Sequence, residues 1–489
     1  MSIAGVLMVD KMFGKWKNKV LYRCIPYNKH LPIFLVPYEE KKSFSKKKIH
    51  KYVLFEYVHW DLKHPIGQLT RTIGNVDDLA CLYEYLMNGL ELHISNTKFT
   101  NTFMKVYKIT NHENHIHQIL GTYAIEDRTH LPVYTIDGAD TQDYDDAFGF
   151  HQMEKGVRCI SIYISNVVLW MEHFNLWSVY GGKTTSIYIP EKTINMLPNK
   201  LTDMVCALKE RSITFAFALD IKIDQNQDIT HQFRNVMLKV KRNFVYDEPA
   251  LLRNEDYREV SRLMKMLGGV VVNSRKTIES MMIYFNTVCG EEMARNNNGI
   301  YRFCNIDEKE QPDIPSELLQ YVSSSDTKSG YGLYMPGIQH QLLGIPTYIH
   351  MTSPIRRLVD MLNMIQFQIN HQMIEVSDEC LQFYQSWIDK IELINERSGG
   401  IKRLEYETKL LNVYHNDPII QEKVFEGFCL NKLTDGIYKI YLPELKISSV
   451  VKVTEDIPLY KNIKCKLYLI QDDINVVQKI RLKMIQVDE

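Results

Sequence analysis

Acidic residues gather in the segment VYTIDGADTQDYDDAFGF, directly after a β-rich run. Carboxylates this close repel one another, so their grouping is costly unless cations neutralise them. Oxygen donors of this kind suit Mg²⁺, and Mn²⁺ as well. Two such ions about 3.5–4 Å apart could act on both the attacking and the leaving oxygen of a phosphodiester. The clustered residues are Asp137, Asp140, Asp143, Asp145 and Asp146.

Other interpretations of the acidic segment differ in the spacing that they require. A calcium-binding EF-hand loop that starts at Asp143 needs glycine at its sixth position, where Phe148 stands, although Glu154 falls correctly at the twelfth. A phosphatase-type D-x-D-T motif fails because Asp140 follows Asp137 by three residues instead of two. A solvated acidic loop with no metal remains open from this segment alone.

A second segment, YIHMTSPIRRLVDMLNMIQF, brings two arginines to the expected start of a helix. Ser353 is a favourable N-cap and Pro354 suits the first helical position, so Arg356 and Arg357 fall in the first turn. Cations are unfavourable at this end of a helix, but together with exposed backbone amides they would bind a phosphate. Alternatively, Arg356 pairs with Asp360 one turn later on a solvated face.

The ends of the chain are rich in short strand-like runs. Residues 19–73 contain several such runs separated by Pro, Asn and a lysine cluster, which predicts a small barrel, and Asp77–Met87 has the spacing of a helix. Residues 422–489 return to strands and contain Asp435-Gly436, a strong hairpin signal. This last unit has the size of a five-stranded OB barrel.

The middle of the chain, about 128–415, mixes strands with long helices and contains no linker of Gly, Ser or Pro, so we expect one large domain. An apolar stripe predicts a core-facing helix over 275–295. A further helix is expected over Leu381–Asn395.

The bulk properties are those of a globular protein with several domains: 489 residues, 45% of them apolar and 24% charged. No apolar run approaches the roughly 18 residues that cross a bilayer, and the N-terminus does not resemble a secretory signal, so we expect a cytoplasmic protein without a membrane partner. Nine scattered cysteines suit neither disulfides nor zinc. With 58 basic and 59 acidic residues, only a local basic channel could bind a polyanion.

Together the two segments resemble the RNB catalytic domain of ribonuclease II, ribonuclease R and the catalytic subunit of the exosome. The matching patterns are D-x5-D-x-D-D after a hydrophobic strand and Y-x-H-x-T-S-P-I-R-R before a helix. The flanks are similar to the cold-shock and S1-type domains of that family. The resemblance implies an α+β multidomain fold. Its parts would be a cold-shock-like OB barrel with a helical extension (1–125), an RNB catalytic domain (126–420) and an S1-type OB barrel (421–489).

The resemblance also implies roles for individual residues. Asp137, Asp143 and Asp146 would ligate magnesium, with manganese as the alternative ion, and Asp145 would serve the chemistry at the scissile phosphate together with Arg356. Tyr188 would stack on a terminal base, although a buried strand tyrosine is the alternative. The other positions that match family motifs are the substrate-binding candidates His350 and Arg357, and Glu279 and Asn286, for which capping or helix packing is the alternative.

The function that follows from the resemblance is hydrolytic, magnesium-dependent 3′-to-5′ exoribonuclease activity, by which a monomer degrades single-stranded RNA to 5′-nucleoside monophosphates. Two departures from the family pattern bear on this expectation. Met364 and Ile365 stand where the family has a polar pair after Asp360, and Ser280 replaces the second residue of a glutamate pair. The alternative is therefore an RNB-fold RNA-binding or scaffold protein with weak turnover or none.

Overall fold

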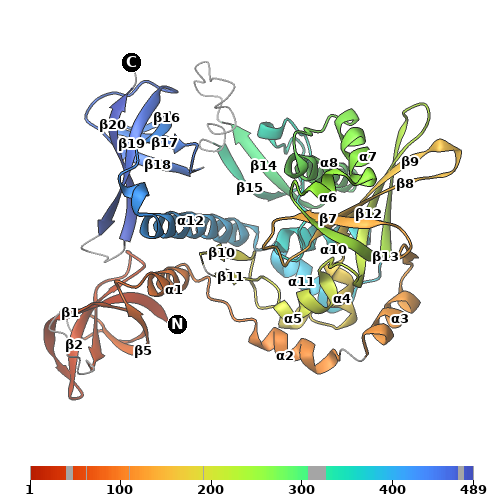
Figure 1. The fold of residues 1–489 in the computed structure, drawn as a ribbon. Helices are drawn as coiled ribbons and strands as arrows, with labels where there is room; N and C mark the ends of the chain where they lie inside the picture. Colours follow the sequence, from red (N-terminus) through yellow and green to blue (C-terminus); the bar gives the residue numbers. More distant parts are fainter. Residues whose placement is uncertain are drawn as a thin grey trace.

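The computed structural model describes residues 2–39, 48–61, 63–108, 111–190, 192–306, 327–445, 447–471 and 478–487. Within these ranges the chain forms two small barrels and a larger central domain (Figure 1). No helix in the described ranges is long and apolar enough to cross a membrane.

The N-terminal unit is a closed five-stranded barrel with the strand order β1-β2-β3-β5-β4. The first half of β1 is mostly buried and its second half is exposed, while β2 is mostly buried or half-buried. The helix that follows begins two residues later than expected, because the Asp78 side chain accepts the N–H groups of Ala80 and Cys81 and so caps it. The elements are β1 (Ile3–Trp16), β2 (Lys19–Pro26), β3 (Phe34–Tyr38), β4 (Lys51–His59), β5 (Ile66–Asn75) and α1 (Leu79–Gly89).

A six-stranded mixed sheet, in the order β12-β9-β8-β7-β13-β6, forms the centre of the molecule. The long strand β13 pairs with β12 over residues 229–239 and with β7 over residues 240–245. Two helices, α2 (Thr97–Val106) and α3 (His112–Thr122), lead into it. Its strands are β6 (Glu126–Asp127), β7 (Val133–Asp137), β8 (Asp146–Gln152), β9 (Arg158–Ser165), β12 (Ile213–Ile223) and β13 (Ile229–Val245).

Helices and two small hairpins complete the central domain and close one large apolar core around the sheet. The helix expected over 275–295 is confirmed as α8 (Ser274–Arg295). The hairpins are β10 (Ile187–Ile189) with β11 (Lys192–Ile194), and β14 (Ile300–Ile306) with β15 (Thr327–Leu333). The other helices are α4 (Val167–His173), α5 (Asn199–Leu201), α6 (Pro249–Leu252), α7 (Glu255–Met266), α10 (Leu358–Asn370), α11 (Asp378–Ile388) and α12 (Ile391–Asn416).

The helix expected over Leu381–Asn395 is wrong, because the chain forms two helices there. Helix α11 ends at Ile388, and Lys390 has the non-helical backbone angles φ −117° and ψ 26° before α12 begins. The apolar spacing continues across this break, so periodicity cannot reveal it. The change of direction sends α12 away from the central core.

The C-terminal unit is a five-stranded sheet in the order β18-β17-β16-β19-β20, whose end strands β18 and β20 lie close together. The expected hairpin is confirmed: Gly436 has φ +67° in the tight turn between β16 and β17. The strands are β16 (Phe425–Thr434), β17 (Ile437–Leu442), β18 (Ile447–Lys452), β19 (Asn462–Gln471) and β20 (Gln478–Val487).

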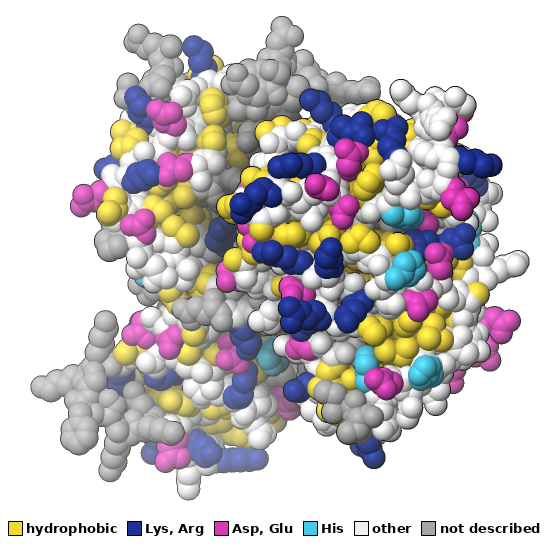
Figure 2. Space-filling view, turned by 45° about the vertical axis from the view of Figure 1, so that its right-hand side comes forward, with side chains coloured by type: hydrophobic (Ala, Val, Ile, Leu, Met, Phe, Trp, Pro, Cys, Tyr) yellow, Lys and Arg dark blue, Asp and Glu magenta, His cyan; other side chains and the backbone are white. Residues whose placement is uncertain are grey.

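Helix α12 joins the three parts. In Figure 1 both barrels lie on the same side of the central domain, and α12 runs from that domain to the C-terminal barrel. One continuous apolar cluster includes Tyr52 of the first barrel, Ile187 of β10, Leu404 of α12 and Ile440 of the last barrel. The face of the protein shown in Figure 2 carries Lys and Arg side chains interspersed with acidic ones.

Candidate active site

The acidic segment connects two neighbouring strands of the central sheet. Asp137 is the last residue of β7 and Asp146 is the first of β8, and these strands pair antiparallel. Their side chains and those of the connecting loop line a pocket of about 770 Å³. Only Asp140 of the five aspartates is exposed, and Asp145 is just 2% exposed. The solvated-loop interpretation does not fit this burial.

Burial and mutual repulsion shift the protonation of the acidic pocket. Burial raises the pKa of Asp137, Asp145 and Asp146 to about 7, and the negative charges of Asp137 and Asp146 oppose each other. The pKa of Asp143 is also raised, by burial and by the neighbouring carboxylate of Asp203. Ionising all of these carboxyl groups together is therefore costly, and a positive charge in the pocket would lower that cost.

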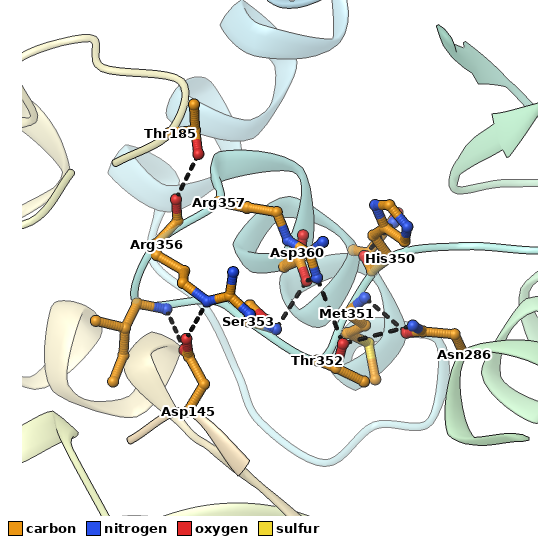
Figure 3. A network of polar contacts seen from close by, with 12 residues as sticks. Asp145, Thr185, Asn286, His350, Met351, Thr352, Ser353, Arg356, Arg357 and Asp360 are labelled. Carbon is orange, nitrogen blue, oxygen red and sulfur yellow. Dashed lines mark hydrogen bonds and ion pairs between the residues drawn. The ribbon is translucent and has the colours of Figure 1, made fainter. Parts of the chain in front are cut away.

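Arg356 and the acidic segment, more than two hundred residues apart in the chain, meet at Asp145 (Figure 3). The backbone N–H of Ile355 donates to Asp145 Oδ1 at 2.9 Å, and Arg356 Nε donates to Oδ2 at 3.0 Å. The Arg356 side chain is still 40% exposed. In the described ranges its two terminal nitrogens have no hydrogen-bond partner, so they are available to an anion in the pocket.

The expected helix start at Ser353 is wrong, because α10 begins at Leu358 and Arg357 is its N-cap. Arg357 has extended backbone angles (φ −134°, ψ 125°) and forms an isolated antiparallel bridge with Thr185. The backbone of Arg356 also bonds to this strand-like segment, since its carbonyl accepts the N–H of Ser186 at 2.9 Å. The arginines thus lie in an extended segment before the helix, and the anion site rests on their side chains instead of on a helical first turn.

The alternative prediction, that Arg356 forms an ion pair with Asp360, is wrong. Arg357 is the residue that pairs with Asp360, at 2.7 Å. The buried Asp360 carboxylate also accepts the backbone N–H of Ser353 at 2.8 Å, which closes the turn that carries both arginines (Figure 3). Asp360 therefore acts as a positioning residue for this turn.

Asn286, on the buried face of α8, supports the same turn from the other side. Its Oδ1 accepts the backbone N–H of Met351 at 2.9 Å, and its amide group lies 3.4 Å from Thr352 Oγ1 (Figure 3). Glu279, one of the two weaker candidates on this helix, lies on the exposed face and pairs with Lys276. The structure brings Asn286 to the site and leaves Glu279 outside it.

Tyr188 lies at the boundary of two pockets. Its side chain is 46% exposed, so the buried-tyrosine interpretation is wrong, and its backbone N–H donates to Glu405 Oε1 at 2.8 Å. Together with Arg356 it lines both the acidic pocket and a second pocket of about 530 Å³. The Tyr188 side chain therefore lies where the two pockets meet.

The second pocket is mainly basic. His350 lies here and its Nδ1 is 2.9 Å from the Tyr331 hydroxyl, while burial and the charge of Arg357 keep the pKa of this imidazole well below its usual range. Arg302 of β14 and Lys402 of α12 also line it. The sequence prediction missed these two cations, and Glu405 as well, because they come from elements that no local motif connects.

The residues that depart from the family pattern, Met364, Ile365 and Ser280, contribute to packing and to local hydrogen bonds. Met364 and Ile365 are fully buried and belong to the central apolar core. Ser280 exchanges hydrogen bonds with the backbone of Val270 and lies away from the acidic pocket. Neither change removes a residue from the wall of the acidic pocket.

The acidic pocket has the donor chemistry that a hard divalent cation requires. Asp137 Oδ2 is buried without a hydrogen-bond partner, and it belongs to the pair of carboxylates that repel each other. As they stand, no three carboxylate, imidazole or thiol side chains in the described part of the chain converge closely enough to enclose an ion.

Comparisons with known proteins agree with these observations. Residues 125–268 match the model of the family described as RNB domain. Ribonuclease R of Mycoplasmopsis pulmonis is 30% identical over 137 residues, which cover 28% of this chain and 19% of that protein. The matched segments span about a fifth of the length of the first curated relatives.

Solved structures show the same fold over almost the whole chain. Mycoplasma genitalium RNase R, in complex with ribose methylated single-stranded RNA, has a TM-score of 0.73 at 16% identity and covers 99% of this chain and 89% of its own. Yeast Ssd1, described as a pseudonuclease, has a TM-score of 0.63 at 12% identity and covers 96% of this chain and 67% of its own. The RNB resemblance and the predicted multidomain fold class are thus confirmed, while the exact domain boundaries stay a prediction.

Proposed function

We propose that the protein is a 3′-to-5′ exoribonuclease that hydrolyses single-stranded RNA to nucleoside 5′-monophosphates with a divalent cation, magnesium in particular. The observation that carries the proposal is the junction at Asp145, whose carboxylate accepts bonds from both Ile355 and Arg356. It joins a negatively charged pocket that suits cations to a guanidinium that suits a phosphate.

The basic pocket is the proposed path of the RNA. Arg302, Arg357 and Lys402 would bind consecutive backbone phosphates there, without regard to base sequence. Tyr188, at the boundary, would stack on a base near the 3′ end, a contact worth about 1–3 kcal/mol. The terminal phosphodiester would then lie in the acidic pocket, beside Arg356.

Asp137, Asp143 and Asp146 are the residues that we propose to hold the cation, since all three line the acidic pocket and Asp145 is engaged with Arg356. When bound, a divalent cation there would lower the pKa of water and polarise the phosphate.

Hydrolysis forms one bond from the water oxygen to phosphorus and breaks the bond from phosphorus to the 3′ oxygen of the preceding nucleotide. The terminal nitrogens of Arg356 would stabilise the negative charge that develops on the phosphate oxygens. Asp145 would keep that guanidinium in place.

A second candidate function, RNA binding without turnover, is favoured by one observation. The fold is shared with yeast Ssd1, which is described as a pseudonuclease, so the fold by itself does not distinguish the two functions. The acidic pocket favours the enzyme, because a scaffold has no need of clustered buried carboxylates whose repulsion costs stability.

End-labelled RNA tests the proposal. A single-stranded oligonucleotide with a 5′ label should shorten from its 3′ end in the presence of Mg²⁺ and release nucleoside 5′-monophosphates, and excess chelator should stop the reaction. A duplex with a 3′ overhang should be a substrate. A duplex with only a 5′ overhang should be shortened more slowly at its recessed 3′ end.

Stable binding of the RNA with no release of nucleotide would favour the scaffold over the enzyme. Shortening from the 5′ end would refute the proposed polarity. The monomeric state and the cytoplasmic location stay predictions.

A further inference from the structure

Residues 92–100 pass beside β11 and α5 (Figure 1). Side chains from all three segments line a third pocket of about 340 Å³. Its volume is at the lower end of the range for small-molecule sites, about 300–1,000 Å³. Asn96 ties its two sides together, since its Nδ2 donates to the backbone carbonyls of Asn195 and Met196 at 3.3 and 3.1 Å. The pocket is therefore part of the folded structure and not a gap between loosely placed loops.

The charge of this third pocket is positive. Lys183, Lys192 and Lys200 line it together with His93, and none of its described lining residues is acidic. The acidic pocket, in contrast, is lined by five aspartates. Because the whole chain has a net charge of only −1, three lysines without a carboxylate are a local feature that suits an anionic ligand.

Lys183 gives the strongest indication of an anion site among the three lysines, because it is only 8% exposed. Its Nζ donates one hydrogen bond, to the carbonyl of Asn195 at 2.7 Å, and within the described ranges it has no ion-pair partner. Burial lowers its pKa to about 8. A buried ammonium without a counter-ion is costly, and an anion in the pocket would offset that cost.

Two residues that line this pocket each have a buried amide oxygen without a donor. Asn96 Oδ1 and Asn195 Oδ1 have no hydrogen-bond partner, while the Nδ2 groups of both side chains are already bonded. A hydroxyl or an amino group of a ligand would satisfy them. A ligand that combines a phosphate with sugar hydroxyls meets both requirements of the pocket.

The third pocket adjoins the acidic one, since Thr193, Asn195 and Asn199 line both. The acidic pocket in turn shares Tyr188 and Arg356 with the basic pocket proposed for the RNA. The three pockets thus follow one another in the order basic, acidic, basic. A negatively charged fragment released in the acidic pocket therefore has an adjoining positive site whose lining residues differ from those of the basic pocket.

We propose that the third pocket is a product site that binds the nucleoside 5′-monophosphate after hydrolysis. The phosphate lies among the ammonium groups of Lys183, Lys192 and Lys200, and the ribose hydroxyls donate to the two asparagine oxygens. The inference rests on the proposed function, and it adds a place for the product apart from the residues that cleave the RNA.

Binding of adenosine 5′-monophosphate tests the site without any turnover. Calorimetry would use the Asp145→Asn protein in chelator and two further variants of it. The first carries Lys192→Gln and Lys200→Gln, and the matched control carries Lys239→Gln and Lys265→Gln, an exposed pair that lines none of the described pockets. Loss of two charge-assisted contacts should weaken binding at least about tenfold in the first pair and less than about twofold in the control.

Two further probes decide the chemical class. Adenosine without phosphate should bind at least about tenfold more weakly than the monophosphate, and inorganic phosphate should also bind more weakly, since it lacks the ribose hydroxyls. Equal affinity for inorganic phosphate and the monophosphate would overturn the nucleotide assignment. Unchanged affinity in the Lys192→Gln, Lys200→Gln protein would overturn the site itself.

These outcomes are separate from those of the proposed function. If the protein releases no nucleotide from RNA but the monophosphate still binds through the lysines, the exoribonuclease proposal fails and the pocket remains a nucleotide site. If the protein cleaves RNA and the lysine variants bind the monophosphate normally, the product site fails alone.

Discussion

Replacement of Asp145 by asparagine tests how the two distant segments act together. The carboxylate accepts one bond from the Ile355 N–H and one from Arg356 Nε, at 2.9 and 3.0 Å. Asparagine keeps one accepting oxygen, but its amide NH₂ group would face the second donor. The variant therefore loses at least one charge-assisted bond, which contributes about 1.5–3 kcal/mol.

This loss sets the expected size of the effect on turnover. A transition state that depends on the position of Arg356 should lose at least that free energy, and the charge of the carboxylate is lost as well, so kcat should fall at least about 100-fold. The affinity for RNA should change less than about threefold, because Asp145 does not line the basic pocket and Tyr188, Arg302 and Lys402 keep their side chains there. Unfolding should change little, by about 1 kcal/mol or a few degrees in Tm, since a neutral amide avoids the desolvation that raises the pKa of Asp145 to about 7.

The assay compares single-turnover cleavage and filter binding in Asp145→Asn and in Asp228→Asn, a control in the exposed turn between β12 and β13. A double-mutant cycle with Arg356→Gln then measures how strongly Asp145 and Arg356 depend on each other in cleavage. If Asp145 acts through Arg356, the two losses should overlap strongly; full additivity would refute the reasoning, as would a large loss of RNA affinity in Asp145→Asn alone.

Three further predictions concern the surroundings of the site. Tyr188→Ala should weaken RNA binding by about 1–3 kcal/mol while Tyr188→Phe stays near the unchanged protein in titrations, and equal effects would argue against stacking. Asn286→Ala should lower the free energy of unfolding by about 1–3 kcal/mol in urea titrations, because the buried Met351 N–H loses its acceptor, and no destabilisation would contradict this role. Lys402→Gln should reduce the salt dependence of RNA binding by about one phosphate contact, and an unchanged slope would remove Lys402 from the RNA path.

Local signals predicted much of the fold. Turn chemistry at Asp435-Gly436 and an apolar stripe at 3.6-residue spacing are decided by neighbours in the chain, so the hairpin and helix α8 are confirmed. The helix start at Ser353 is wrong for the opposite reason. Its capping signals are local, whereas the bridge from Arg357 to Thr185 that keeps the segment extended joins residues far apart in the chain.

The candidate site could be predicted in part. The spacing of the aspartates is a short-range pattern, and the structure brings Asp137, Asp143, Asp145 and Asp146 to one pocket with Arg356. The contact between Asp145 and Arg356 could be expected only through the family resemblance, because no periodicity connects the two segments.

The remainder of the site depends on long-range packing that the sequence does not reveal. Lys402 and Glu405 reach the basic pocket because α12 turns away from α11 at Lys390 and passes β10. Lys183 becomes a buried cation only when residues 92–100 cover it.

A crystal structure of the Asp145→Asn protein with a short RNA and Mn²⁺ would locate the cation and the RNA 3′ end in one experiment. We expect anomalous density for manganese among Asp137, Asp143 and Asp146, with the last phosphodiester of the RNA beside the Arg356 guanidinium. Manganese bound elsewhere, or an RNA 3′ end that lies away from Arg356, would contradict it.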